Sequence, residues 1–369
     1  MARAGLGPSW TCLFANEIDA KKALAYRANW GGGAELRVAD VAGITAAQAP
    51  GVADLAWASF PCQDLSLAGA GAGLEGARSG TFHAFWRIVK ELVAEGRAPR
   101  IVVLENVCGT LTRRAGRDFQ AICAALTDAG YRHGALVVNA ALFTPQSRPR
   151  LFLIAVRSDV RIDPTLLGDG PGDPFHTPAL RKAVDGLGPA ARSKMLWWRT
   201  PAPAVRAVTL ADLIETHPLG VRWHTPAQTA RLLGLMSPAN LAKVKLAGRS
   251  GGERVGAVYR RTRADERGIR SQRAEVRFDD LAGCLRTPAG GSSRQAILFV
   301  HGLKVRSRLI SPRETARLMG LADSYRLPEN GNDAYHLTGD GVAVPVVRHL
   351  ARHILEPLLA TRTQALDAA

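Results

Sequence analysis

The chain has 369 residues, of which 47% are hydrophobic and 22% charged, a composition that is typical of folded globular proteins and excludes a disordered chain. Lysine and arginine number 48 against 32 aspartates and glutamates, which gives a formal net charge of +16 at pH 7. No apolar run is long enough for a membrane span and no secretory signal is recognised, so we expect a cytoplasmic protein. Five cysteines without a CxxC pair indicate neither a disulfide framework nor a zinc site, and we expect no metal.

The first 155 residues alternate short apolar runs with longer amphipathic stretches, a rhythm that predicts an α/β domain. Several of the apolar runs are continuous, as expected for strands of a sheet that helices cover on both faces, which is a doubly wound arrangement. The expected strands are Thr11–Ala15, Glu35–Ala39, Leu55–Ser59, Ile101–Leu104, Ala135–Asn139 and Leu151–Val156. The expected helices are Asp19–Asn29, Thr81–Glu95 and Asp118–Ala129.

After Val156 the composition changes, because proline and glycine become frequent and an arginine-rich stretch follows. We therefore expect residues 1–156 to form the first part of one domain and residues 157–308 to form a second, smaller domain. Ser311, Pro312 and Glu314 read as the start of a helix with a capping box. Residues 309–360 are expected to return to the first domain, with a last helix from about Pro345 to Leu359, and 361–369 to form a frayed tail.

The positive charge is unevenly placed. Residues 241–310 contain 16 lysines and arginines against six aspartates and glutamates. Such a segment indicates a polyanionic partner, of which nucleic acid is the commonest. An arginine-rich composition also arises from a GC-rich genome, and this alternative stays open at the level of composition.

Three short segments carry residues suited to catalysis. Cys62 directly follows a predicted strand, which places a thiol at the edge of the sheet where ligands bind; the alternative is a buried, inert cysteine. Glu105 follows a second strand, where it is either a functional carboxylate or a helix cap. Arg148 and Arg150 precede a third strand and lie on one side of the chain, where they bind a phosphate or base edge or else form a solvated turn.

Taken together and in this order, Pro61-Cys62-Gln63, Glu105-Asn106-Val107 and Gln146-Ser147-Arg148-Pro149-Arg150 resemble the motifs of the DNA (cytosine-5)-methyltransferase family of bacteria and phages. The resemblance covers nearly the whole chain and extends to Asn16-Glu17-Ile18-Asp19, to Asp40-Val41 and to the segment 313–320. It implies a Rossmann-like methyltransferase sheet with an inserted target-recognition region.

The resemblance implies a chemistry for the three motifs. The Cys62 thiolate would add to C6 of a cytosine and activate C5 to accept a methyl group from S-adenosylmethionine. Glu105 would hold the N3/N4 edge of the base, and Arg150, supported by Arg148, would contact its O2. The base would have to leave double-stranded DNA to be reached, and the glycine-rich segment from Leu65 to Gly80 would be the closing loop.

The resemblance also assigns binding residues. Cofactor contacts are expected from Glu17, Ile18, Asp40, Val41, Pro61, Phe82, Asp340 and Val342. DNA contacts are expected from Gln63, Ser66, Arg286, Arg294 and Gln295. The segment Gly339-Asp340-Gly341-Val342 departs from the Gly-Asn-Ser-Val that most members carry there. The four other cysteines, Cys12, Cys108, Cys123 and Cys284, are assigned to packing.

A further departure lies at the front, where the family begins with a strand and a Phe-x-Gly-x-Gly loop. Met1–Gly7 reads instead as the helix that follows that loop, so we expect the first strand to be absent from this sequence. Two alternatives to an active DNA methyltransferase stay open. One is an RNA (tRNA) cytosine-5 methyltransferase of the same fold, and the other is a catalytically silent DNA-binding remnant. We expect a monomer, with a cognate restriction endonuclease as a further partner.

Overall fold

The computed structural model describes residues 1–60, 80–264, 268–287 and 294–360. Expectations for Pro61, Cys62, Gln63 and Ser66, and for the predicted loop up to residue 79, lie outside the described residues. Within the described ranges, no helix has the length and hydropathy needed to cross a bilayer.

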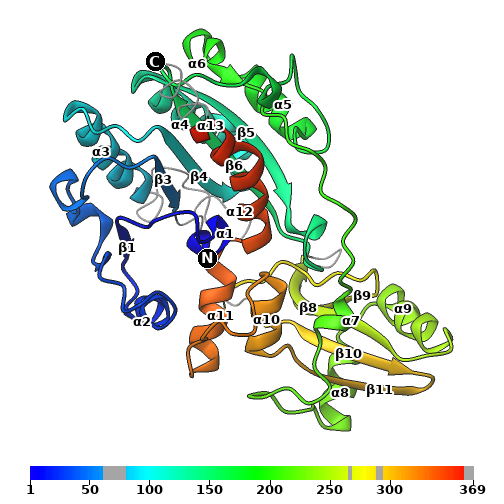
Figure 1. The fold of residues 1–369 in the computed structure, drawn as a ribbon. Coiled ribbons are helices and arrows are strands. Elements are labelled where there is room, and N and C mark those ends of the chain that lie inside the picture. The colour runs from blue at the N-terminus through cyan, green and yellow to red at the C-terminus, as the bar shows by residue number, and fades with distance from the viewer. Residues whose placement is uncertain (61–79, 265–267, 288–293, 361–369) are drawn as a thin grey trace.

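The central sheet has five strands and confirms the predicted α/β class (Figure 1). Its order is β3 (Leu55–Ser59), β4 (Ile101–Val107), β6 (Pro149–Arg157), β5 (Tyr131–Asn139) and β7 (Met195–Leu196). The pairs β3–β4 and β5–β7 are parallel, whereas β6 runs antiparallel to both of its neighbours. The sheet is therefore mixed, and its strands β4 and β6 contain the continuous apolar runs predicted over Ile101–Leu104 and Leu151–Val156.

Helices cover both faces of this sheet, as a doubly wound arrangement requires. Alternate residues of β4 point to opposite faces, so that Val102 and Leu104 join one core cluster while Ile101 and Val103 join the other. The first face is covered by α3 (Thr81–Ala94), α4 (Arg117–Asp128), α5 (Pro178–Asp185) and α6 (Pro189–Ser193). The other is covered by α12 (Val344–Leu350), η8 (Ala351–Leu355), α13 (Glu356–Ala360) and α1 (Ala2–Leu6).

The first two predicted strands form a separate pair. β1 (Ala15–Glu17) lies parallel to β2 (Leu36–Val38), with α2 (Ala20–Asn29) between them in sequence, and within the described residues they pair only with each other. These two strands therefore lie apart from the five-stranded sheet. The strand expected over Thr11–Ala15 begins only at Ala15, where the Ala15 amide donates to the Glu35 carbonyl. Helix α1 confirms the helical prediction for Met1–Gly7.

A second, antiparallel sheet contains most of the arginine-rich segment and lies at the lower right of Figure 1. Its order is β11 (Lys304–Leu309), β10 (Ala296–His301), β8 (Arg254–Ala264) and β9 (Arg270–Arg277). Side chains of α8 (Pro226–Gly234) and α9 (Pro238–Gly248) share one hydrophobic cluster with this sheet, and α7 (Leu210–Leu213) precedes them. This sheet and its helices form a second, smaller unit that is separate from the central sheet.

Part of the segment that follows Val156 packs on the first sheet. Strand β7 pairs with β5, and α5 packs in the same core cluster as α3 and α4, so residues 178–196 pack on the first sheet. They do so because Leu180, Val184 and Leu187 give this segment an apolar face that the first sheet buries. The exact division at 157–308 stays a prediction.

After β11 the chain returns to the first unit through α10 (Pro312–Leu318) and α11 (Gly331–Asp340). The predicted capping box is confirmed, since Ser311 and Glu314 each accept from the backbone amide of the other. Glu314 also forms a fully buried ion pair with Arg308, with Nη2 and Oε1 2.6 Å apart. The last helical segment is present where predicted, interrupted by the π-helical η8.

Candidate active site

The candidate site lies at the edge of the central sheet where β3 and β4 end. These strands are parallel and pair Ser59 with Glu105, so Cys62 follows three residues after the partner of Glu105. Glu105 is buried at 6% exposure, and β4 continues past it to Val107. On the other side, β6 pairs Val107 with Arg150. Arg150 therefore reaches diagonally to Glu105, with 3.2 Å between its Nε and the Glu105 Oε1.

Arg148 lies deeper than Arg150 and has a different set of contacts. It is 2% exposed and donates to the backbone carbonyls of Leu285, Gly339 and Gly341 at 3.0, 2.8 and 2.7 Å. Its guanidinium thus joins the 146–150 motif to the segment before β10 and to the 339–342 motif. These contacts suit the supporting role expected of Arg148.

Cys284 is the residue of this site that the sequence did not single out. Its Sγ lies 3.4 Å from Nη1 of Arg148 and 3.8 Å from Nη2 of Arg150. Burial opposes the thiolate, but the charges of Arg148 and Arg150 outweigh it and hold the pKa of Cys284 below the ordinary thiol value. By contrast, burial raises the pKa of nearby Cys108. Assigning Cys284 to packing alone was incomplete; its position two residues before Arg286 was the only signal in the sequence.

The motif that carries both arginines is bound to the segment around Cys284 by backbone contacts. The Ser147 amide donates to the Ala282 carbonyl, and the Ala282 amide donates to the Pro145 carbonyl. Gln146 is fully buried, accepts from the Leu285 amide and donates to the Leu318 carbonyl. Two segments about 135 residues apart in sequence thus form one rigid support, because their polar backbone groups satisfy each other.

The expected cofactor residues at the first two strands lie at one edge. β1 and β2 are parallel, so Glu17 and Asp40 follow neighbouring strands at the same end. Glu17 accepts from the Asp19 amide and Asp40 accepts from the Ala42 amide. The side chain of Ile18 is 66% exposed, although it is large and apolar. Two carboxylates beside an exposed apolar side chain suit a ligand with hydroxyl groups and a flat ring.

The remaining expected cofactor residues are placed differently. Phe82 is buried between Phe60 and Trp86, whose rings lie 5.5 and 6.0 Å from its own, and it belongs to the core. Val342 is also part of the core, at 5% exposure. Asp340 is partly exposed and forms an ion pair with Lys22, with 2.6 Å between Oδ2 and Nζ. Asp340 thus joins α11 to α2.

The expected DNA contacts of the second unit also differ among themselves. Arg286 is exposed, and Arg294 stacks on Tyr335 with 4.7 Å between the guanidinium carbon and the ring centre. Gln295 is buried, and its amide accepts from the Gly283 amide and donates to the Gly283 carbonyl, both at 2.8 Å. Its polar atoms are therefore occupied by the protein, and a base contact from Gln295 is not favoured by this arrangement.

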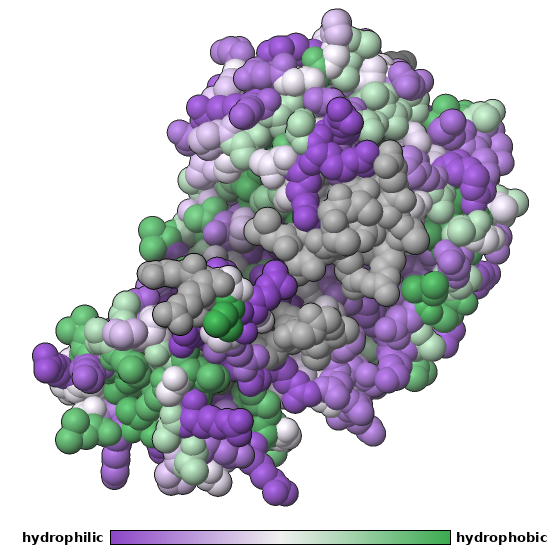
Figure 2. All heavy atoms as spheres, turned by 180° about the vertical axis from the view of Figure 1, so that it is seen from behind, coloured by the Kyte–Doolittle hydropathy of each residue, from purple (hydrophilic) through white to green (hydrophobic). Residues whose placement is uncertain are grey.

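A small cavity of about 60 Å³ lies between the two units. Its lining includes Cys284, Arg286 and Arg294 together with Tyr259 and Tyr335. Hydrophilic side chains are spread over both parts of the surface seen from behind in Figure 2. Among the described residues, no cluster of histidine, cysteine or carboxylate side chains is arranged to hold a metal ion.

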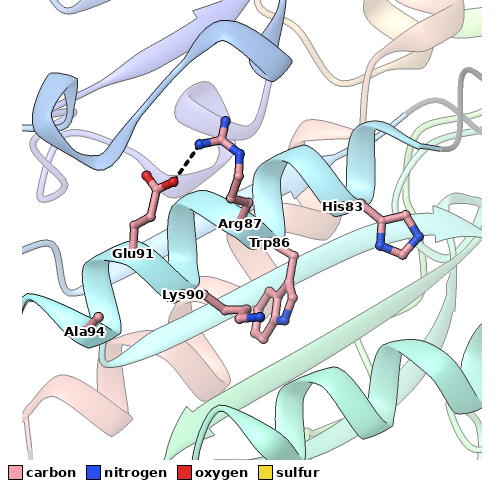
Figure 3. A pocket seen from close by; sticks show the side chains of 6 residues that line it. All are labelled: His83, Trp86, Arg87, Lys90, Glu91 and Ala94. Carbon is pink, nitrogen blue, oxygen red and sulfur yellow. Dashed lines mark hydrogen bonds and ion pairs between the residues drawn. The ribbon is translucent and has the colours of Figure 1, made fainter.

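A larger hollow of about 420 Å³ lies along α3 and contains none of the motif residues (Figure 3). Two of its charged side chains, Arg87 and Glu91, are paired with each other and hydrogen-bonded to the backbone. Arg87 pairs with Glu91 at 2.6 Å and also donates to the carbonyls of Ala42 and Ile44. This hollow therefore reflects how α3 is fixed to the segment after β2, and it is not the candidate site.

The model of the family described as C-5 cytosine-specific DNA methylase matches residues 1–356. The chain belongs to this family. The methylase is 26% identical over 345 residues to the Type II methyltransferase M.HhaI of Haemophilus parahaemolyticus, covering 93% of this chain and 87% of that protein. It is likewise 26% identical over 351 residues to the Type II methyltransferase M.NlaX of Neisseria lactamica, covering 95% and 90%. The family is one of enzymes, and the expected resemblance is confirmed.

Solved structures support the same fold for the methylase. A DNA modification methyltransferase encoded within an E. coli prophage superposes with a TM-score of 0.56 at 17% identity, covering 97% of this chain and 95% of that chain. The S. pombe Dnmt2 methyltransferase superposes with a TM-score of 0.53 at 16% identity, covering 94% and 91%. At these identities the likeness shows the fold alone.

Proposed function

We propose that this methylase transfers a methyl group from S-adenosylmethionine to C5 of a cytosine that has been flipped out of double-stranded DNA. The observation that carries the proposal is the Glu105–Arg150 pair, which lies beside the strand end that leads to Cys62. A carboxylate and a guanidinium held together offer one acceptor and several donors to the polar edge of a base. Family membership supplies the reaction class.

In the proposed reaction, the Cys62 thiolate forms a bond to C6 of the cytosine, and the electron pair of the C5–C6 double bond makes C5 nucleophilic. Glu105 binds the N3/N4 edge and offsets the charge that develops there, while Arg150 contacts O2. C5 then forms a bond to the methyl carbon, and S-adenosylhomocysteine leaves with the electron pair of the broken carbon–sulfur bond. Loss of the C5 proton and departure of Cys62 restore the double bond and release 5-methylcytosine.

The proposed cofactor fits the groups at the ends of β1 and β2. S-adenosylmethionine supplies an electrophilic methyl group. The Glu17 and Asp40 carboxylates suit hydroxyl and amino donors, and exposed Ile18 and neighbouring Val41 suit the adenine face. Phe82 and Val342 are core residues, so we propose that they shape the pocket wall from behind; Pro61 stays a prediction of the sequence.

The DNA is proposed to lie between the two units, against the second sheet. Exposed Arg260, Arg270 and Arg273 of β8 and β9 are suited to phosphate contacts, and Arg286 and Arg294 lie nearer the site. Gln63 and Ser66 follow the nucleophile in sequence and stay predicted contacts. A cognate restriction endonuclease is a further proposed partner, since the two relatives compared above are Type II methyltransferases.

The test is transfer of labelled methyl groups from S-adenosylmethionine to duplex DNA by the full chain. The variant Cys62→Ala and a competing tRNA substrate are measured beside it. Label that enters DNA, and only with Cys62 present, is the expected result. Label in tRNA alone would make the protein an RNA methyltransferase, and a folded chain that binds DNA without transferring label would make it a silent remnant.

A further inference from the structure

Four charged or ionisable side chains form a row behind the candidate site. Glu105 contacts Arg150 at 3.2 Å, Arg150 contacts Cys284 at 3.8 Å, and Cys284 contacts Arg148 at 3.4 Å. The two arginines come from one strand edge, whereas Cys284 comes from a segment more than 130 residues later. The fold has therefore inserted a sulfur between two guanidinium groups.

Two adjacent guanidinium groups repel each other, and Arg148 cannot relieve this by moving into water. It is buried, and its two terminal nitrogens donate to the carbonyls of Leu285, Gly339 and Gly341. Burial, and after it the Arg150 guanidinium, lowers the pKa of Arg148, while Cys284 opposes both. An anionic sulfur between the guanidinium groups would offset this repulsion and give alternating charges from Glu105 to Arg148.

A neutral thiol would leave the repulsion between the two guanidinium groups in full. It would donate to the Leu285 carbonyl, 3.5 Å from Sγ, which also accepts from Arg148 at 3.0 Å. Other ionisable groups around Cys284 include Arg286, whose charge favours the thiolate, and Cys108, whose own pKa burial raises. Tyr259 and Tyr335 line the same cavity. The cavity beside Cys284 adds further positive charge from Arg260, Arg261 and Arg294.

We propose that Cys284 is a positioning residue, whose sulfur holds the Arg148 and Arg150 side chains at the spacing that presents Arg150 to Glu105 and to the base. The role in catalysis rests on the proposed function. Cys284 touches neither substrate nor cofactor in this role. It connects the segment that leads to β10 with the catalytic arginine, so the second unit helps to set the geometry of the site.

The first test needs no methyl transfer. The full chain is alkylated with iodoacetamide from about pH 6 to about pH 10, and the rates at the Cys284 and Cys108 peptides are followed by mass spectrometry. We expect the Cys284 rate to reach half its plateau at a lower pH than the Cys108 rate. In Arg150→Gln the Cys284 midpoint should rise. A midpoint at or above about 8.5, the ordinary thiol value, would overturn the proposal.

The second test separates charge from size. Cys284→Ser keeps the volume without the charge, and Cys284→Asp keeps a negative charge in a side chain of similar volume. We expect kcat to fall on the order of 10-fold in the serine variant, with an unchanged KM for S-adenosylmethionine, and to recover in the aspartate variant. Cys108→Ser is the matched control and should keep full activity.

The outcomes distinguish this proposal from the proposed function. Wild-type activity in Cys284→Ser, or equal losses in the serine and aspartate variants of folded protein, would overturn the positioning role while the methyltransferase remains. A wild-type chain that transfers no methyl group to DNA or RNA would overturn the proposed function. If the alkylation midpoint of Cys284 is low in such an inactive chain, Cys284 is a structural contact only. That result would also overturn its role in catalysis.

Discussion

The Nε of Arg150 lies 3.2 Å from the Oε1 of Glu105, although the two residues occupy different strands. Their contact is diagonal, because the antiparallel register of β4 and β6 places Arg150 opposite Val107 rather than opposite Glu105. Both side chains are largely buried, at 15% and 8% exposure. Each therefore fixes the other in an orientation that solvent does not compete for, and a base in the site would meet a preorganised pair.

Replacing the Glu105 carboxylate should slow the reaction. We expect Glu105→Gln to lower kcat by about 100-fold or more, because the neutral amide cannot offset charge on the base or pair with Arg150. The KM for S-adenosylmethionine should stay unchanged. Steady-state methyl transfer measures both, with Glu253→Gln, which alters an exposed ion pair of the second unit, as the control. An unchanged kcat in Glu105→Gln would remove Glu105 from the mechanism.

The buried pair of Arg308 and Glu314 should dominate the stability of the junction between the units. Both side chains are 0% exposed, and Glu314 also accepts from the Ser311 and Glu215 amides. We expect Glu314→Gln to lower the free energy of unfolding by about 3–5 kcal/mol, since it leaves a buried, uncompensated guanidinium. Urea denaturation measures this. Glu253→Gln should change the same quantity by about 0–1 kcal/mol; equal effects in the two variants would contradict the prediction.

The free energy of unfolding should fall at mildly acidic pH, because His133 stays neutral in the native state but is protonated in the unfolded chain. This side chain is 0% exposed in β5, and burial lowers its pKa to about 4. The native state keeps it neutral, whereas the unfolded chain protonates it below about pH 6.5. Its contribution is thus fully present above about pH 6.5 and is lost as the pH falls toward 4.

The check is the free energy of unfolding of His133→Gln at about pH 7.5 and about pH 5. The variant should lose roughly 2 kcal/mol less than the wild type between these pH values. His217→Gln, at an exposed site, should behave as the wild type does. His349 is also buried, and burial lowers its pKa to about 4, so it contributes an equal pH dependence to the wild type and to both variants. A wild-type slope in His133→Gln would show that His133 titrates normally.

The arginines of β8 and β9 should account for the salt dependence of DNA binding. Arg260, Arg270 and Arg273 are exposed on one hairpin. Changing all three to glutamine should reduce the slope of log affinity against log salt by up to about 3, or about 0.9 for each lost phosphate contact. Fluorescence anisotropy with a labelled duplex measures the slope. Arg192→Gln, on α6, should leave it unaltered, and an unaltered slope in the triple variant would place the DNA elsewhere.

Local sequence determined much of this protein. Continuous apolar runs identified β4 and β6, because strands buried on both faces need apolar residues at every position. Ser311 and Glu314 identified the start of α10, since a capping box is satisfied within four residues. The motifs around Glu105 and Arg150 predicted the site residues and identified the family. They could do so because the residues expected at each strand end lie together in one short segment of the sequence.

Tertiary structure decided which of these segments meet. The five-stranded sheet, the separate β1–β2 pair and the packing of residues 178–196 on the first sheet depend on strand pairing across long stretches of chain. The sequence alone left the Gln295 side chain free to contact DNA. In the structure its amide is hydrogen-bonded to the backbone of Gly283. Cys284 belongs to no catalytic motif. Its proximity to the positive charges of Arg148 and Arg150 is a property of the tertiary structure alone. Side-chain pattern is a local property, whereas the partner, burial and electric field of a side chain are set by packing between residues distant in sequence.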